Sequence, residues 1–320
     1  MNNKICIDFG GENLKIHHNQ FGVVFNEKSL LAAEKRGKKY AIIKTGTETA
    51  KFLEENHENI VVFSPISEGV IQSVEYAAAL LKRALYENLN RKHLKNALAI
   101  ISVPSGISTS QKSDFIKVCK LCGLKNINIA DAPISTLLGA NEFQPEDEVL
   151  VIDLGASKCD FQILKNFNVK AGATLGLGSN SIKNALQKTL WEDEQFWPSP
   201  KSLNKIQEEL CTLHKSNAER LEVTGIYFPQ SEELTKSMSA QKFFPITNGF
   251  FNEVVLVAKT LINEYQNNSN SSIQNILLAG GLAKTIGLEK FFLKHFPNTK
   301  IVITEDPENA NLRGLIRLMA

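Results

Sequence analysis

The sequence predicts an α/β fold in which one unit occurs twice, with mixed sheets flanked by helices. Strand-like apolar runs alternate with amphipathic helical stretches, which is typical of a largely parallel sheet wrapped by helices. The stretch "VLVIDLGASKC" in the middle of the chain has the pattern of "KICIDFGGENL" at its start, a strand that ends in an aspartate and a turn of small residues. The 320 residues, 43% of them hydrophobic, suffice for about two domains.

The first half begins with strands. Strand patterns cover residues 4–8, 14–18, 22–26, 30–33 and 40–44. A helical stretch then follows Thr45-Gly46, a long amphipathic helix is expected over residues 73–89, and "ALAIISVPSG" is typical of a buried strand. The next helix, capped by Thr109 or Ser110, is expected to stop at Gly123, before a strand in "NINIADAP" and a helix in "ISTLLGANEF".

The polar joint "QPEDE" marks the expected boundary between the halves. After it come a hairpin, a strand near residues 169–174, the turn "LGLGSNS", a helix, an irregular insert, and then a helix, a strand, a turn and a helix. The insert, residues 191–246, contains two helix-like segments and is the expected counterpart of residues 27–65. We therefore predict domain I at 1–145 plus the C-terminal helix 308–320, with a small subdomain at about 27–65, and domain II at 146–307, with a small subdomain at about 185–246.

Composition narrows the partners and the location. The 36 basic and 34 acidic side chains give a formal charge of +2, so no nucleic-acid partner is expected. No apolar run approaches the roughly 18 to 20 residues of a membrane span and no signal peptide opens the chain, so we expect a cytoplasmic protein. Five cysteines without repeated spacing predict reduced thiols. Cys119 and Cys122 lie at the C-terminal end of a helix, which favours ordinary helix residues over a redox or zinc site.

The two small-residue turns predict a phosphate site. Without bulky side chains, backbone N–H groups there can approach an anion closely. Asp8 and Asp153 end the preceding strands, and their charges are costly beside phosphates unless a divalent cation and its waters lie between. Both are therefore candidate Mg²⁺ ligands through water. The alternative is sheet architecture without a ligand.

A third element, "IQNILLAGGLAKTIGLEKFF", predicts a strand, the pair Gly280-Gly281 and a helix. Two glycines let a flat ring or a ribose lie against the backbone, and the helix N-terminus adds a partial positive charge. The alternative is a tight strand-to-helix turn.

In this order and spacing the three elements resemble the phosphate 1, phosphate 2 and adenosine motifs of the actin-like ATPase superfamily. The phrases P-x-x-x-G-V-I and V-P-S-G-I narrow the resemblance to the MreB family, bacterial actin homologues that organise rod-shaped cell-wall growth. It covers nearly the whole chain. It implies the actin-like fold, in which two ribonuclease-H-like domains, each with a small subdomain, face a nucleotide cleft that holds ATP and Mg²⁺. The nucleotide-binding residues it implies are Gly10, Gly11, Asn13, Gly155, Ala156, Ser157, Lys158, Gly178, Asn180, Gln207, Gly280, Gly281 and Leu282.

Several positions depart from the family pattern. The first turn lacks the usual hydroxyl after Gly10 and carries the acidic Glu12. The second has Gly155-Ala156-Ser157-Lys158-Cys159 in place of Gly-Gly-Gly-Thr-Thr. Lys158 then either brings a positive charge to the phosphate or magnesium position or lies solvated at the hairpin edge.

Other departures concern catalysis and the adenosine side. The glutamate that orients the attacking water is replaced by Ala132, which leaves Asp131, on the opposite strand face, as the remaining catalytic candidate. Gly178-Ser179-Asn180 replaces Gly-Gly-Asp, Gln207 replaces a lysine over the adenine, and Leu282 stands where the ring must pass. Together these changes predict weak nucleotide binding, with hydrolysis weak or lost.

The resemblance implies a cytoskeletal filament protein of cell shape and peptidoglycan synthesis. Its expected partners are further copies of itself, other MreB-type proteins and membrane proteins of cell-wall synthesis. The alternatives are a non-hydrolysing scaffold and a small-molecule kinase of the same fold, which the MreB-like phrases in residues 27–71 disfavour. A DnaK-type chaperone is disfavoured because about 40 residues follow the adenosine-like motif. The basic loop "ENLNRKHLKN" predicts a weak contact with the inner face of the membrane or, alternatively, a solvated helix end.

Overall fold

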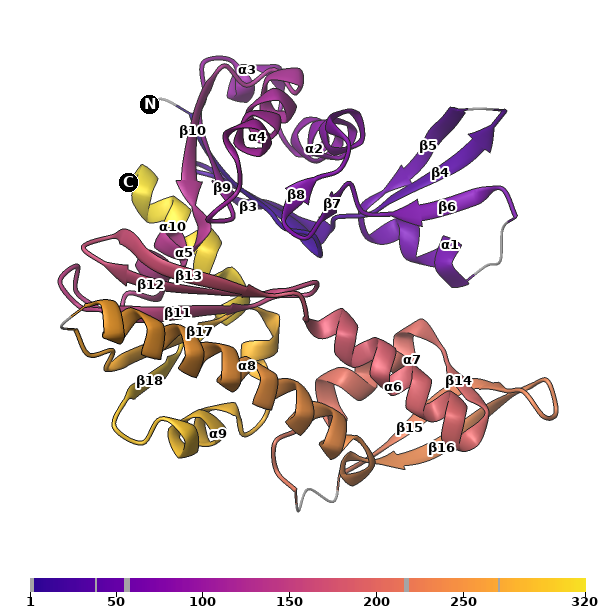
Figure 1. Ribbon diagram of the computed structural model, residues 1–320. Coiled ribbons are helices and arrows are strands. Elements are labelled where there is room, and N and C mark those ends of the chain that lie inside the picture. Colours follow the sequence, from indigo (N-terminus) through magenta and orange to yellow (C-terminus); the bar gives the residue numbers. More distant parts are fainter. Residues whose placement is uncertain (1–2, 38, 55–57, 216–218, 270) are drawn as a thin grey trace. The chain divides into compact units, whose positions relative to one another are not determined.

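The computed structural model describes residues 3–37, 39–54, 58–215, 219–269 and 271–320 (Figure 1). The chain forms two compact units. Unit 1 comprises Met1–Phe143 and Asn309–Ala320, and unit 2 comprises Gln144–Glu308. Among the helices of the described residues, none has the length and apolar character that a membrane span requires.

Unit 1 is built on a five-stranded mixed sheet of order β10-β9-β1-β2-β3. β1 pairs antiparallel with β2 and parallel with β9, so the hairpin is joined to a parallel half. The strands are β1 (Lys4–Phe9), β2 (Asn13–His18), β3 (Gly22–Lys28), β9 (Leu98–Val103) and β10 (Asn126–Asp131).

Helices cover both faces of this sheet because the side chains of β1 alternate between two cores. Ile5 and Ile7 belong to the core that includes buried residues of α2 (Val74–Asn88) and α4 (Thr109–Leu121). Cys6 belongs to a smaller core formed with α10 (Ala310–Met319). This alternation is the period-2 pattern that predicted the strand.

The C-terminal helix α10 packs tightly on α5 (Ala132–Ala140). A Cβ at Gly139 would lie 1.7 Å from the Ala310 carbonyl oxygen, and one at Gly314 would lie 1.6 Å from that of Ser135. Only glycine permits so close an approach of the two backbones. The last helix is therefore an integral part of unit 1.

The rest of unit 1 is small. A three-stranded sheet of order β5-β4-β6 is followed by a two-stranded ribbon. The elements are β4 (Leu31–Arg36), β5 (Lys39–Thr45), α1 (Lys51–Glu54), β6 (Ile60–Phe63), β7 (Ile66–Ser67), β8 (Val70–Ile71) and α3 (Arg91–Leu94).

Unit 2 repeats this architecture, which confirms the predicted duplication. Its large sheet has the order β13-β12-β11-β17-β18, with the hairpin β11-β12 antiparallel and β11 parallel to β17. The strands are β11 (Val149–Leu154), β12 (Cys159–Lys165), β13 (Asn168–Leu175), β17 (Asn275–Ala279) and β18 (Lys300–Ile303).

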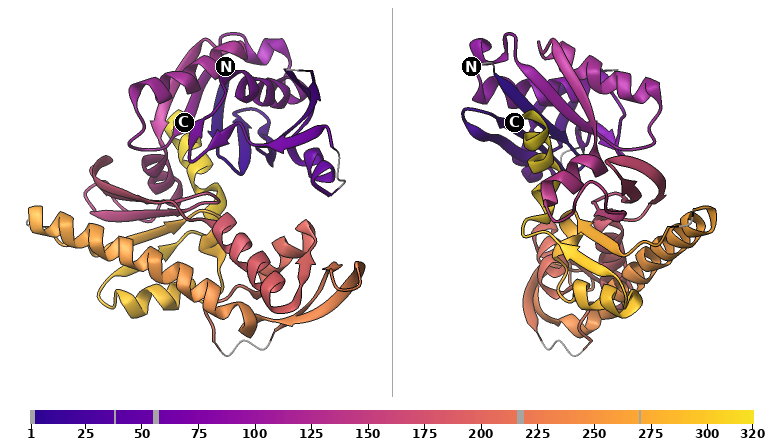
Figure 2. Two further views of the ribbon diagram at one scale, coloured as in Figure 1. Left: turned by 45° about the vertical axis from the view of Figure 1, so that its right-hand side comes forward. Right: turned by 90° about the vertical axis from the view of Figure 1, so that its left-hand side faces the viewer.

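One continuous core fills unit 2. It lies between the large sheet and the helices α6 (Ser179–Glu194), α8 (Ala240–Asn268) and α9 (Leu288–His295). Figure 2 shows α8, in orange, running from the large sheet to the small sheet of this unit, and α8 contacts both β13 and β16.

The insert of unit 2 differs from its prediction as two helix-like segments. A three-stranded sheet of order β14-β15-β16 accompanies one short helix and a π-helical turn at Ile206–Leu210. Its strand bounds are β14 (Phe196–Pro198), β15 (Arg220–Tyr227) and β16 (Glu232–Ser239), and the helix is α7 (Pro200–Lys205). Few side chains of β15 and β16 are buried, so the apolar alternation that signals a strand is weak there.

Two smaller expectations concern α4. Its cap is Ser108 rather than Thr109 or Ser110, because Ser108 and Gln111 form a capping box one residue earlier. Cys119 and Cys122 are ordinary buried residues, as predicted, and burial raises the pKa of each thiol to about 12. Thiols with such pKa values remain protonated and unreactive at neutral pH.

Candidate functional site

The two predicted turns have the same geometry, each within its own unit. In unit 1, Gly10 N–H donates to the Asn13 carbonyl at 3.0 Å, and in unit 2, Gly155 N–H donates to the Lys158 carbonyl at 3.1 Å. A Cβ at Gly155 would lie 2.8 Å from that carbonyl oxygen, so this turn requires glycine. The corresponding gap at Gly10 is 3.2 Å, which leaves slightly more room.

In unit 2, the hairpin turn caps helix α6. Ser179 N–H donates to the Gly155 carbonyl at 3.1 Å, and Asn180 N–H donates to the Ala156 carbonyl at 2.9 Å. Gly178 is forced by this approach, because a Cβ there would lie 2.5 Å from the Ala156 carbonyl oxygen. The hairpin carbonyls thus satisfy N–H groups that a helix N-terminus leaves unpaired. The predicted residues of the hairpin and of the "LGLGSNS" turn therefore meet in one place.

The third element joins the same place through Asp153. Asp153 is the register partner of Ala279 on the neighbouring parallel strand. A Cβ at Gly280 would lie 2.5 Å from Asp153 Oδ1, and the φ of Gly280 is +85°. Unit 2 therefore brings Asp153, Gly155, Gly178 and Gly280 together at the carboxyl ends of β11 and β17, where α/β sheets commonly bind ligands.

The segment after Gly280 differs from the expected helix. A short 3-10 turn, Gly281–Lys284, follows, and α9 starts only at Leu288. No N-terminus of an α-helix therefore stands at the glycine pair within the described residues. Glu308 lies beside Gly281 instead, 3.6 Å from the position of a Cβ there, and pairs with Lys284 Nζ at 2.9 Å.

Leu282 is not an obstacle to a ring, and that expectation was wrong for its side chain. The residue is 6% exposed and belongs to the core of unit 2. Its side chain is directed into the protein because a 3-10 turn replaces the expected helix.

Lys158 is not solvated at the hairpin edge, which excludes that alternative. Its side chain is 17% exposed, and its Nζ lies 2.7 Å from Asp160 Oδ2. The other oxygen of Asp160 accepts a hydrogen bond from Thr174 Oγ1 at 2.7 Å. Asp160 faces Asp153 across the hairpin, and two carboxylates in such a pair repel unless a positive charge is near. Lys158 supplies that charge.

In unit 1, Asp8 is held by a network that the sequence did not predict. Asn311 Nδ2 donates to Asp8 Oδ1 and to Ser102 Oγ, both at 2.9 Å. Ser135 Oγ donates to Asn311 Oδ1 at 2.5 Å. Burial raises the pKa of Asp8, whereas the charge of Lys15 and these hydrogen bonds favour the ionised form. Asn311 thus links β1, β9, α5 and α10.

Lys15 is a further residue that sequence reasoning missed. It is 7% exposed and is the register partner of Asp8 across the first hairpin. A signal was available, because a four-residue turn after Phe9 places residue 15 opposite residue 8 and on the same face.

The remaining residues of the first turn are tied to unit 1. The Gly10 carbonyl accepts from Ser29 Oγ at 2.6 Å, and the Gly11 carbonyl accepts from Ser64 Oγ at 3.2 Å. Glu12 pairs with Lys28 at 2.5 Å, which neutralises the acidic charge that is unfavourable near phosphate.

Two predicted residues lie in other surroundings. Asp131, at the end of β10, pairs with Lys112 Nζ at 3.3 Å. Gln207 lies half-buried in the π-helical turn Ile206–Leu210. Neither position by itself indicates a catalytic or adenine-binding arrangement.

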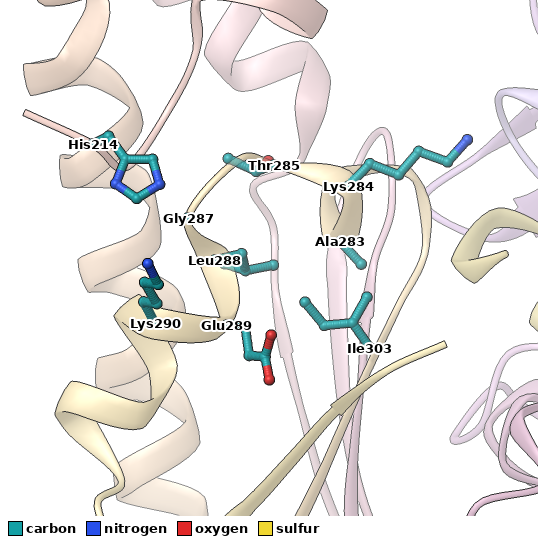
Figure 3. Close-up of a pocket in the computed structure, with 9 residues that line it drawn as sticks. All are labelled: His214, Ala283, Lys284, Thr285, Gly287, Leu288, Glu289, Lys290 and Ile303. Carbon is teal, nitrogen blue, oxygen red and sulfur yellow. The ribbon is translucent and has the colours of Figure 1, made fainter. Parts of the chain in front are cut away.

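A shallow cavity of about 310 Å³ lies in unit 2 just after the glycine pair (Figure 3). Its lining residues are His214, Ala283, Lys284, Thr285, Gly287, Leu288, Glu289, Lys290 and Ile303. None of the predicted site residues lines it. A Cβ at Gly287 would lie 3.2 Å from the His214 ring, which forms one wall.

Comparison with known proteins identifies the family. The sequence model described as MreB/Mbl protein matches residues 2–320. The cell shape-determining protein Mbl of Bacillus subtilis (strain 168) is 20% identical over 309 residues, covering 95% of this chain and 91% of the relative. The cell shape-determining protein MreB of Escherichia coli (strain K12) is 19% identical over 324 residues, covering 98% and 92%.

Solved structures agree in fold. MreB5 of Spiroplasma citri bound to ADP has a TM-score of 0.88 at 21% identity, covering 99% of this chain and 96% of that one. A MamK double helical filament has a TM-score of 0.79 at 18% identity, covering 99% of both chains. The predicted fold class and resemblance are confirmed: the chain belongs to the MreB/Mbl family and has the actin-like fold.

Proposed function

We propose that this cytoskeletal actin homologue determines cell shape as an ATP-binding protein that joins filaments and hydrolyses ATP slowly or not at all. The match of the MreB/Mbl family model to residues 2–320 carries the proposal, because no large part of the chain is left for another function. The curated relatives described above are named as cell shape-determining proteins.

The geometry of unit 2 supports nucleotide binding. Gly155, Gly178 and Gly280 converge near Asp153, and each stands where a Cβ would collide with backbone or carboxylate oxygens. Two similar structures of Spiroplasma citri MreB5 contain ADP and AMPPNP. We propose that the turn Gly155-Ala156-Ser157-Lys158 contacts the phosphates and that the glycine pair contacts the adenosine. That the first hairpin contributes Gly10, Gly11 and Asn13 remains a prediction.

Hydrolysis is the weakest part of the apparatus. Ala132 offers no acid-base group, and Asp131 forms an ion pair with Lys112. The loss of a positioned acid-base group typically costs about 10² to 10⁴ in rate. We therefore expect slow phosphate release even where ATP is bound.

Self-association follows from the proposal, since the similar MamK structure is a double helical filament. Other MreB-type proteins and membrane proteins of cell-wall synthesis remain predicted partners. A membrane contact would use the exposed Arg91, Lys92 and Lys95 at α3, at about 1 kcal/mol per charge. Leu94 is buried and adds no apolar anchor, so we expect such a contact to be weak and peripheral.

A sedimentation assay with and without ATP, with phosphate release followed in the same tube, tests the proposal. Pelleting that depends on ATP, with little phosphate released, is expected. Pelleting without nucleotide would favour a scaffold that does not respond to ATP. Phosphorylation of a small sugar would instead establish a kinase and contradict the proposal.

Asp153→Ala tests the placement of the nucleotide. The substitution removes the carboxylate beside Gly280, so it should weaken ATP binding. Asp147→Ala, outside the predicted site residues in the same unit, is the matched control. An unchanged ATP affinity of Asp153→Ala would show that the site lies elsewhere.

A further inference from the structure

The fold family implies a magnesium ion beside the phosphates, and the candidate carboxylates fit that ion poorly. A Mg²⁺ site needs carboxylate oxygens available to the metal or to its waters. Both oxygens of Asp160 are engaged, one by Lys158 and the other by Thr174. Oδ1 of Asp8 accepts from Asn311 and lies 3.4 Å from Ser102 Oγ. Protein donors thus occupy positions that metal-bound waters would take.

The second hairpin already contains a cation at its turn. The backbone of Lys158 is fixed, because its carbonyl closes the turn with Gly155 N–H. Its ammonium group is largely buried against Asp160. An ammonium has three N–H donors, so one can bond Asp160 while others point toward a phosphate. The residue thereby joins a fixed backbone to a phosphate-binding charge.

The first hairpin contains a second buried cation. Lys15 is 7% exposed and faces Asp8 across the strands. A buried ammonium is costly unless a negative charge lies near it. Asp8 supplies that charge, and an anionic ligand bound at this hairpin would add to it.

The two lysines together carry a charge of +2, which is the charge of one Mg²⁺. Their positive charge would also repel a divalent cation placed beside them. We propose that this chain binds ATP without a divalent cation, with the Lys158 and Lys15 ammonium groups neutralising the phosphates. The inference rests on the proposed nucleotide function and specifies how the phosphates are recognised.

Titration calorimetry with AMPPNP, in buffer with magnesium and in buffer with EDTA, tests the inference on the full chain. The two affinities should agree within about threefold, or about 0.7 kcal/mol. A loss of about tenfold or more in EDTA would overturn the inference but leave the proposed function intact. Absence of binding in both buffers would overturn both.

Lys158→Ala is the decisive variant. In EDTA it should bind AMPPNP at least about tenfold more weakly than the natural chain, and added magnesium should restore part of the loss. Lys165→Ala is the matched control, because Lys165 lies at the other end of the same strand and pairs with Glu148 at 2.8 Å. The control should stay within about threefold of the natural chain, and an unchanged affinity of Lys158→Ala in EDTA would refute the role of this lysine.

A folding check keeps the result interpretable. Both variants should unfold in urea near the midpoint of the natural chain. Lys158→Arg, which keeps the charge, should retain EDTA-resistant binding if Lys158→Ala loses stability. Loss of binding by both variants, with folding intact, would mean that the charge of Lys158 is not what binds the phosphates.

Discussion

Gly280→Ala tests the closest approach in the candidate site. Gly280 has φ +85° and ψ 172°, a region that essentially only glycine populates. A Cβ there would lie 2.5 Å both from Asp153 Oδ1 and from the Leu154 carbonyl oxygen. The carboxylate can rotate away, but the carbonyl belongs to β11 and cannot move alone. The substitution must therefore displace the end of a central strand.

The expected loss of stability has two parts. The strained backbone conformation costs about 1–3 kcal/mol, and forcing a methyl group into a filled space costs about 1–3 kcal/mol more. The sum, about 2–6 kcal/mol, is a large fraction of the roughly 5–15 kcal/mol that stabilises a typical native protein.

Gly281→Ala is the matched control. Its Cβ would meet only the Glu308 side chain, at 3.6 and 4.0 Å, and its φ is not positive. We expect its stability to change by less than about 0.5 kcal/mol. If the adenosine lies against this backbone, the added methyl group should nevertheless weaken ATP binding.

Urea unfolding followed by tryptophan fluorescence is a suitable assay, because both tryptophans, Trp191 and Trp197, lie in unit 2. The signal therefore reports the unit that contains both glycines. Equal stability of Gly280→Ala and the natural chain would refute the packing argument. So would an equal loss in the two variants.

Three further predictions concern stability and reactivity. Gly139→Ala should destabilise unit 1 by about 1–3 kcal/mol or more, because its Cβ would meet the Ala310 carbonyl, whereas Gly249→Ala, at an exposed position of α8 with nothing within 4 Å, should stabilise unit 2 by about 0.5–1 kcal/mol; urea unfolding by circular dichroism measures both, and equal effects would contradict the contrast. Burial, with the nearby His93, lowers the pKa of His18, so the unfolded chain binds the proton more readily and stability should fall as the pH drops below about 6.5. His18→Phe should reduce this dependence in unfolding curves at several pH values, and an unaltered slope would contradict the assignment. All five cysteines are buried, so an aromatic disulfide reagent should label none in the native protein and five in urea, and rapid native labelling would contradict their burial.

The sequence was most informative where burial is regular. The strands of both large sheets follow from alternating buried residues, and the duplication follows from two aspartates that precede similar turns. The hairpin β15-β16 was missed because only Val223 and Gly225 of β15 and Met238 of β16 are buried, which leaves little apolar alternation to detect.

The candidate site divides in the same way. Local geometry made the roles of Gly155, Gly178 and Gly280 accessible, since turns depend on neighbouring residues. Asn311 was not accessible, because it lies 303 residues from Asp8 along the chain and no local pattern relates the two. Lys15 stands between these cases, since the length of its turn determines its partner.

The position of α10 in unit 1 bears on how the protein folds as it is made. Unit 2 is one continuous stretch, whereas the core of unit 1 includes Leu312, Leu315 and Met319 packed with Cys6 and Ile100. During translation, the domain that is made first must therefore wait for residues 310–319, while the domain inserted within it can complete its core earlier. The ribosome thus delivers the two halves of a duplicated fold in one order, and they mature in the reverse order.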